Sequence, residues 1–337
     1  MKPRISIIIP TFNRPEKLKR SLRSALSQSI QPDEIIVIDN GENPRTESSI
    51  KEVEENFSGP TIRYLRSKLF DIRQALATSI KAATGEWIIL LDDDDYLVPD
   101  RIQNDIQQIE KVSEEVILLL QDFVRVDYTG KLIWEHLMQH KQMGLYQALT
   151  LDSFPPPPAG TWRASVIKER HSYDQANGGT DFDLYASCLP FGKIHKTGRI
   201  GYVMDDTRHC TRLTTSADHM LEMVDLHRIR FKESREYLKS DELKSTVDKR
   251  LDQQQAFFAA KLLGPHAFFD SNNSSICRQN LKETLKGIIA PLRKTFSSLL
   301  GGMLPEMRGS KSYSLKQFGQ RHPGLSRLIK TSKLTEE

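Results

Sequence analysis

The feature that most constrains the fold is an alternation of short apolar runs with segments of helical period. The apolar runs cover residues 5–9, 35–38, 62–65 and 87–91. They are short and rich in Ile, Val and Leu, as expected of buried parallel strands. Leu18, Leu22 and Leu26 recur at helical spacing, and a second helix is expected over residues 71–83, closed by Gly85. This order predicts an α/β fold with a Rossmann-like, mostly parallel sheet flanked by helices.

Polar residues directly follow three of the predicted strands. Thr11 and Asn13 come after the first strand, Asp39 after the second, and residues 92–95, all aspartate, after the fourth. In a sheet of parallel strands, ligands bind beyond the carboxyl ends of the strands. We therefore expect these side chains to meet at one edge of the sheet and to form the functional site.

The run of aspartates is the most informative local feature. Adjacent carboxylates at the end of a buried strand repel one another and lose hydration, so a positive charge should offset them. Carboxylate oxygens suit Mg²⁺ or Mn²⁺, ions that commonly also bind substrate phosphates. Asp92 and Asp94 have the D-x-D spacing. The alternative is an acidic loop before the next helix, in which Asp95 acts only as a cap.

Several motifs occur in the order and at the spacing of a known family. They are ISIIIPTFNR (residues 5–14), EIIVIDNG (34–41), ATGE (83–86), LLDDDDYLVP (90–99), GGTDFDL (178–184) and FGKI (191–194). Together they make residues 3–215 resemble a family 2 glycosyltransferase of the GT-A fold. Members of that family transfer a sugar from a nucleotide-diphosphate donor to an acceptor hydroxyl, with inversion at the anomeric carbon.

The resemblance implies roles for particular residues. It places Asp39 against the donor's base, usually uracil, Asp94 on a divalent metal ion, and Asp181 as the general base. Arg73 lies where members place a basic residue facing the nucleotide, and His209 where a histidine approaches the diphosphate or the metal. Further donor contacts are implied for Pro10, Thr11, Asn13, Arg14, Asp92 and Asp93.

Four of these residues also have a purely structural interpretation. Asp39 precedes Asn40-Gly41 and would form a turn. Arg73 would lie on a solvated helix face, and Asp181 would be an acid favoured by the dipole at a helix N-terminus. His209 would be an ordinary packed or surface side chain.

The chain departs from the family pattern at two positions. Thr180 replaces the first acid of a Glu-Asp pair, which makes Asp183 a substitute candidate, and Ala77 stands where many members have Asn. These departures keep open a non-catalytic, GT-A-like binding or scaffold module. A nucleotidyltransferase is a weaker alternative, because residues 10–14 lack the Gly-rich basic signature it would need. Trp162 is expected either to stack on an acceptor sugar or to belong to the core.

Charge divides the chain into two parts. Residues 1–215 carry a net charge of −3, whereas residues 216–337 carry +7 and have a helical pattern. We predict a catalytic domain over residues 1–215 and a helical, basic extension over residues 216–337. Over residues 281–300, apolar and basic side chains would lie on opposite sides of a helix. That profile fits either peripheral contact with anionic lipid or packing on a protein surface.

Cysteine usage and hydropathy indicate where the chain works. The 3 cysteines lie far apart and form no CxxC pair, so neither a thiolate zinc site nor a secreted disulfide framework is expected. No apolar run approaches the roughly 18 residues of a membrane span, and the first run is too short for a signal peptide. We expect a cytoplasmic, at most peripherally membrane-associated enzyme of polysaccharide biosynthesis. It would use a saccharide or lipid-linked acceptor and no nucleic acid.

Overall fold

The computed structural model describes residues 2–57, 59–60, 62–67, 71–127, 132–136, 142–149, 155–171, 181–206, 229, 231–263, 274–282 and 284–287. The N-terminal elements are β1 (Ile5–Thr11), α1 (Pro15–Leu26), β2 (Glu34–Asp39), α2 (Arg45–Glu54), β3 (Ile62–Arg66), α3 (Ile72–Ala82), β4 (Trp87–Leu90), β5 (Tyr96–Leu97) and α4 (Arg101–Ile109). The later elements are β6 (Val116–Asp127), β7 (Leu132–His136), β8 (Gln142–Met143), α5 (Leu145–Leu149), η1 (Pro157–Ala159), β9 (Gly160–Arg163), α6 (Ala164–Arg170), α7 (Asp181–Cys188), η2 (Leu189–Phe191), β10 (Lys193–Asp206), α9 (Asp241–Leu263) and α10 (Ser274–Gln279). The predicted strands match β1 to β4, and the helix predicted over residues 71–83 is α3.

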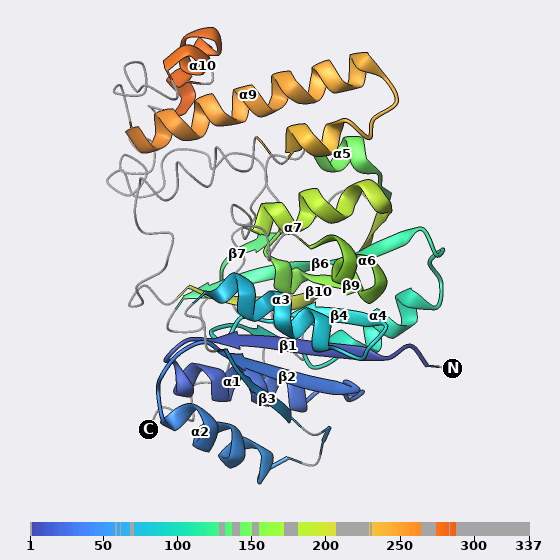
Figure 1. The fold of residues 1–337 in the computed structure, drawn as a ribbon, viewed down its shortest axis with the longest axis vertical. Helices are drawn as coiled ribbons and strands as arrows, with labels where there is room; N and C mark the ends of the chain where they lie inside the picture. Colours follow the sequence, from blue (N-terminus) through green and yellow to red (C-terminus); the bar gives the residue numbers. More distant parts are fainter. Residues whose placement is uncertain are drawn as a thin grey trace.

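The described strands form one sheet that is parallel in its first half and mixed in its second. Its order is β3-β2-β1-β4-β9-β6-β10-β5, with β7 beside β6 and β8 beside β10 (Figure 1). The strands β1 to β4 are parallel, as predicted. Beyond them β9 runs antiparallel between β4 and β6, whereas β6 and β10 are parallel to each other. The α/β class is confirmed, and the antiparallel strands lie in the part without a clear alternating pattern.

Helices cover both faces of the sheet, and the side chains of β1 alternate between them. Ile5, Ile7 and Ile9 pack in one buried cluster with residues of α1, α2 and α4. Ile8 packs in another cluster with residues of α3, α6 and α7. Figure 1 shows α1 and α2 on one side of the sheet and α3, α6 and α7 on the other. The alternation along β1 therefore fills two hydrophobic layers, which explains why isoleucines occupy both faces of this strand.

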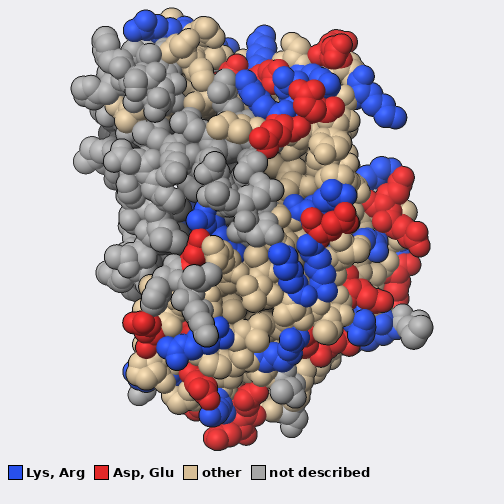
Figure 2. Space-filling view, viewed as in Figure 1, with Lys and Arg blue, Asp and Glu red and all other residues tan. Residues whose placement is uncertain are grey.

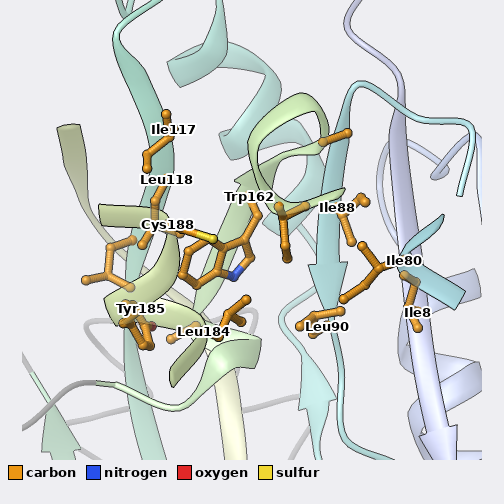
Figure 3. Close-up of a cluster of buried hydrophobic side chains, with 14 of the residues drawn as sticks. Ile8, Ile80, Ile88, Leu90, Ile117, Leu118, Trp162, Leu184, Tyr185 and Cys188 are labelled. Atoms are coloured by element: carbon orange, nitrogen blue, oxygen red, sulfur yellow. The ribbon is translucent and has the colours of Figure 1, made fainter. Parts of the chain in front are cut away.

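Trp162 belongs to the core. Its side chain is 1% exposed, and its ring lies 5.0 Å from that of Tyr185, centroid to centroid. Figure 3 shows Trp162 among Leu118, Leu184, Tyr185 and Cys188. A buried indole cannot stack on an acceptor sugar, so the core interpretation of this residue is the correct one.

The ATGE motif ties the amino ends of three strands together. The Ser6 hydroxyl donates to Glu34 Oε1 at 2.6 Å, and the Gly85 N–H donates to Ser6 Oγ at 2.8 Å. Thr84 also donates to Glu34, through its hydroxyl at 2.8 Å. A Cβ on Gly85 would lie 2.4 Å from Ser6 Oγ. The glycine is therefore required for this close approach. The predicted helix ends before it, because Ala83 already has an extended backbone.

A buried ion pair joins α4 to the second half of the sheet. Arg101 Nε lies 2.8 Å from Asp105 Oδ2, and both side chains are 0% exposed. Arg101 also donates to Thr161 Oγ1 at 2.7 Å and to the carbonyl of Pro158 at 3.1 Å. Asp105 accepts further hydrogen bonds from Thr161 and Gln121. Each charged group has several partners, as a buried ion pair requires.

The C-terminal helices pack on the end of the molecule that carries α5 and α7 (Figure 1). Phe231, Val247 and Leu251 share a buried cluster with Leu149 of α5 and Ala186 of α7. The predicted domain boundary at residues 215/216 lies outside the described residues. Within the described part of the chain, no helix has the length and apolar character needed to cross a bilayer. Acidic and basic side chains mix over the described surface seen in Figure 2.

Candidate functional site

The ends of β1, β2 and β4 meet at the carboxyl edge of the sheet. Thr11 and Asp39 are paired in the register of β1 and β2, and the Leu91 N–H donates to the carbonyl of Ile8 at 2.9 Å. The aspartate run therefore begins beside the end of β1. Thr11 Oγ1 donates to Asp93 Oδ2 at 2.7 Å. Pro10 is buried within β1, one residue before this contact.

Asp93 is the buried member of the aspartate run. It is 1% exposed, and its Oδ1 lies 2.6 Å from Arg14 Nη2. Burial raises its pKa to about 6, although Arg14 and the Thr11 hydroxyl favour the ionised form. Asp94 is more accessible, and its Oδ2 lies 2.8 Å from Arg14 Nη1 and 3.8 Å from Lys17 Nζ. Asp92 is exposed.

One face of α1 supplies the positive charge that the aspartates need. Arg14 just precedes the helix, and Lys17 and Arg20 follow at intervals of three residues. Arg20 donates to the Asp94 carbonyl at 2.5 Å and pairs with Asp205 Oδ2 at 2.5 Å. The sequence interpretation missed Lys17 and Arg20, although their i, i+3 spacing after Arg14 was a readable signal.

Asp95 is buried and directly precedes β5. The Tyr202 hydroxyl donates to its Oδ2, and the Asp205 N–H donates to its Oδ1 at 2.8 Å. The interpretation of Asp95 as a cap is wrong, because β5 follows it and its carboxylate faces β10. Burial raises the pKa of Asp95 to about 7 and that of Tyr202 well above its ordinary value. The pKa of Asp205 is also raised by burial.

These shifts predict a pH dependence of stability. A raised carboxyl pKa means that the folded state holds a proton that the unfolded state has lost. The free energy of unfolding should therefore fall as pH rises from about 4 to about 7. The Asp95→Asn variant should lack part of this fall. Its free energy of unfolding, relative to that of wild type, should therefore rise from about pH 4 to about pH 7 and stay constant above that. Urea unfolding at a series of pH values, without divalent ions, measures the difference.

Glu34 provides the internal contrast for that experiment. Although burial opposes its ionisation, hydrogen bonds from Ser6 and Thr84 and the Arg63 contact lower its pKa to about 2. Its contribution to stability is complete above its ordinary value of 4.5 and is lost as pH falls toward 2. The pH range over which Glu34 affects stability therefore barely overlaps that of Asp95.

Stability curves of wild type and Asp95→Asn that ran parallel between pH 4 and 7 would contradict the assignment of this pH dependence to Asp95.

Asp39 is held in a fixed orientation at the end of β2. It is buried, and it accepts from the Gly41 N–H at 2.8 Å through Oδ1 and from the Tyr64 hydroxyl at 2.9 Å through Oδ2. Burial, together with the adjacent Asp39 carboxylate, raises the pKa of Tyr64 to about 12. The turn interpretation is therefore correct in part, because Asp39 does bond the backbone two residues on. Tyr64 was not predicted.

Asn13 shapes the loop between β1 and α1. Its φ of 56° is left-handed, a conformation that Asn tolerates, and its Oδ1 accepts from the N–H groups of Glu42 and Asn43 at 2.9 Å. A Cβ on Gly41 would lie 2.6 Å from that oxygen, so glycine is needed there. The adjacent Phe12 is 47% exposed, and the sequence pattern did not single out this aromatic side chain.

Two of the remaining predicted residues lie in the first turn of a helix. Arg73 is in the first turn of α3, where its guanidinium pairs with Asp71 Oδ2 at 2.8 Å. Because α3 follows β3, this turn lies toward the carboxyl edge of the sheet. Asp181 is the first residue of α7. Thr180 and His209 lie outside the described residues.

The family model for "Glycosyl transferase family 2" matches residues 6–167. This span includes the whole edge cluster from Thr11 to Asp95. Residues 6–167 belong to glycosyl transferase family 2. The recognition made from the sequence motifs is thereby confirmed.

Two curated relatives share about a quarter of the aligned residues with this chain. An uncharacterized glycosyltransferase of Methanocaldococcus jannaschii is 24% identical over 192 residues, which cover 56% of this chain and 65% of that protein. The chondroitin synthase of Escherichia coli is 25% identical over 206 residues, which cover 59% of this chain and 28% of that protein. The chain therefore matches less than two thirds of the length of these relatives.

Solved glycosyltransferase structures share the fold. Residues 1–349 of S. aureus TarS superpose with a TM-score of 0.59 at 13% identity, covering 85% of this chain and 81% of that one. A mannosyltransferase of Pyrobaculum calidifontis, in complex with GDP-Man and Mn²⁺, gives a TM-score of 0.52 at 13% identity, covering 100% of this chain and 88% of that one. The fold is the GT-A type expected for family 2.

The carboxylates at this edge suit a divalent cation in chemistry and in charge. Asp93, Asp94 and Asp205 pair with Arg14, Lys17 and Arg20, and with the neighbouring Asp92 and Asp95 the group has a formal charge of −2. Within the described residues, Arg14 and Lys17 both contact the Asp94 carboxylate at Oδ2. Among the described residues, no group of three or more His, Cys, Asp or Glu side chains is placed to hold a metal ion between them. An ion here would complete its shell with phosphate and water, as Mg²⁺ commonly does.

Proposed function

We propose that this chain transfers a sugar from a nucleotide-diphosphate-sugar, a UDP-sugar, to a hydroxyl of a glycan or lipid-linked saccharide, with inversion and with help from Mg²⁺ or Mn²⁺. One observation carries the proposal: within a family 2 domain, a fixed carboxylate at Asp39 lies on the same sheet edge as the Asp93–Asp94 cluster and the basic face of α1. Such an edge can hold a base, a diphosphate and a cation together. The TarS structures bound to UDP and UDP-GlcNAc support the choice of donor.

The donor would lie across the ends of β2 and β1. Asp39 accepts hydrogen bonds and so suits the N–H of uracil, while the exposed ring of Phe12 offers a face for the base. Arg14 and Lys17 bring positive charge to Asp94 and to a diphosphate beside it. We propose that Arg73 and His209 add charge on the nucleotide and metal sides. When bound at Asp94, a divalent cation neutralises charge on the leaving diphosphate.

We propose Asp181 as the general base of a single displacement. It removes the proton from the acceptor hydroxyl as that oxygen attacks the anomeric carbon. The bond from that carbon to the phosphate oxygen breaks, and the nucleoside diphosphate leaves with its electron pair. Attack opposite the leaving group inverts the anomeric centre. The first turn of a helix favours an ionised aspartate, the form that a base requires.

The test measures nucleoside diphosphate released from UDP- and GDP-sugars, with and without Mn²⁺, for wild type, Asp181→Asn and Asp183→Asn. Asp181→Asn should lower transfer by about 10²–10⁴-fold, the usual weight of a general base, while Asp183→Asn retains activity. The NMR coupling at the new anomeric centre reports inversion. Release from no donor would contradict the proposed function, and a loss confined to Asp183→Asn would move the base to that residue.

We further propose that the basic extension contacts anionic membrane lipid. Leu281 and Leu285 lie four residues apart and are 52% and 46% exposed, beside the exposed Lys282 and Lys286. An apolar stripe flanked by lysines is the profile of an interfacial helix. The double variant Leu281→Asp/Leu285→Asp should sediment less with phosphatidylglycerol vesicles, and Ile229→Asp, at another exposed apolar residue, should not. Equal sedimentation of all three proteins would contradict this contact.

A further inference from the structure

A cavity of about 490 Å³ lies at the end of α7 remote from Asp181. Its walls come from the last turn of α7, from η2 and from residues 233–237. Two aromatic side chains, Phe191 and Tyr237, and two carboxylates, Glu233 and Glu236, line it together with Ser187. Since α7 has 8 residues, this cavity is separated from the proposed base by a helix about 12 Å long.

The aromatic side chains of the cavity are exposed and mutually fixed. Phe191 is 38% exposed and Tyr237 is 58% exposed. Their rings meet edge to face, with 5.5 Å between centroids, and the Arg170 guanidinium lies 4.1 Å from the centroid of Phe191. Paired aromatic side chains on a surface mark a place where something binds more often than single ones do.

Contacts within the protein tie the walls of the cavity to one another. Ser234 Oγ donates to the carbonyl of Ala186 at 2.7 Å, which fastens residues 231–235 to α7. Phe231 packs in the buried cluster that also contains Ala186. Glu236 is held by Arg235 at 2.7 Å and by Lys244 at 2.9 Å. The aromatic faces and the carboxylates are therefore presented in a preorganised arrangement, which reduces the entropy lost on binding.

We propose that this cavity binds a saccharide unit of a glycan acceptor, at a distance from the unit that reacts. The C–H face of a pyranose ring packs on the negative face of an aromatic ring, and carboxylates accept hydrogen bonds from sugar hydroxyls. The assignment rests on the proposed function for the reacting end of the acceptor. It adds that the acceptor is a chain of several sugars, long enough to follow α7.

Affinity electrophoresis tests the cavity without any need for catalysis. Native gels would contain dextran, xylan, glycol chitin or chondroitin sulfate, and would be run with wild type, Tyr237→Ala, Tyr237→Phe and Ile229→Ala. We expect at least one polysaccharide to slow the wild type. Tyr237→Ala should bind it about fivefold more weakly, the weight of one aromatic contact. Tyr237→Phe keeps the ring and should bind like wild type, as should Ile229→Ala, at an exposed apolar residue that does not line the cavity.

The outcomes separate this inference from the proposed function. Nucleotide-sugar turnover without retardation in any gel would leave the function standing and overturn the saccharide site. Equal retardation of wild type and Tyr237→Ala would overturn its location. Sedimentation velocity on the same proteins tests whether a second copy of the chain occupies the cavity instead. A self-association that is lost in Tyr237→Ala would assign this surface to a second copy and overturn the proposal.

Discussion

Asp94→Asn is expected to lower the rate of sugar transfer by about a thousandfold while leaving the fold at least as stable. The expected loss follows from removing the accessible carboxylate that would hold the cation at the diphosphate, where charge stabilisation carries much of the rate. Stability should not fall, because the Asp94 charge raises the pKa values of its buried neighbours Asp93 and Asp95. Neutralising it relieves repulsion among carboxylates. Steady-state kinetics and thermal unfolding of the same preparation measure the two effects.

Asp100→Asn is the matched control for that substitution. Asp100 is exposed, it follows the same loop, and its side chain makes no capping hydrogen bond to α4. Its substitution should change neither turnover nor melting temperature. A further readout separates cation binding from a structural role: Mn²⁺ with a nucleoside diphosphate should raise the melting temperature of wild type and of Asp100→Asn, but not of Asp94→Asn. If the Asp94→Asn enzyme remained active, the assignment of the cation to Asp94 would be contradicted.

The strand ends could be predicted because the pattern that sets them is local. Period and composition identify β1, β2 and β4, and chain order alone places Thr11, Asp39 and the aspartates on one edge. The helical spacing of Leu18, Leu22 and Leu26 also predicts α1, although the basic face of that helix was overlooked. By contrast, α2 has only Ile50 and Val53 as apolar core residues among many polar ones, so its pattern was too weak to predict.

The partners of Asp95 could not be predicted, because they come from far along the chain. Tyr202 and Asp205 are more than 100 residues away and reach Asp95 only because β10 pairs with β5. The insertion of β9 between β4 and β6 likewise depends on long-range packing around Trp162. Local sequence therefore indicates the donor-binding edge, while the charge state of its buried carboxylates depends on tertiary contacts.

Arg101→Met is expected to lower the free energy of unfolding by about 3–5 kcal/mol, the usual result of breaking a buried ion pair from one side. The substitution leaves Asp105 fully buried without its cation, and it also removes hydrogen bonds to Thr161 and Pro158. These contacts join α4 to η1 and β9, so the loss should appear in the global urea transition. Met has a similar length and leaves a smaller void than Ala, which keeps the cavity contribution low.

The double variant Arg101→Met/Asp105→Leu decides whether the loss comes from the stranded charge. Replacing both partners by apolar residues removes the buried carboxylate, so this protein should be more stable than Arg101→Met alone. The exposed pair Glu47–Lys51 has the same i, i+4 spacing with both side chains more than half exposed, and Lys51→Met should change stability little. If the double variant were as unstable as the single one, lost hydrogen bonds to η1 and β9, rather than uncompensated charge, would carry the effect. A loss no larger than that of Lys51→Met would mean that this buried pair does not hold α4 to the sheet.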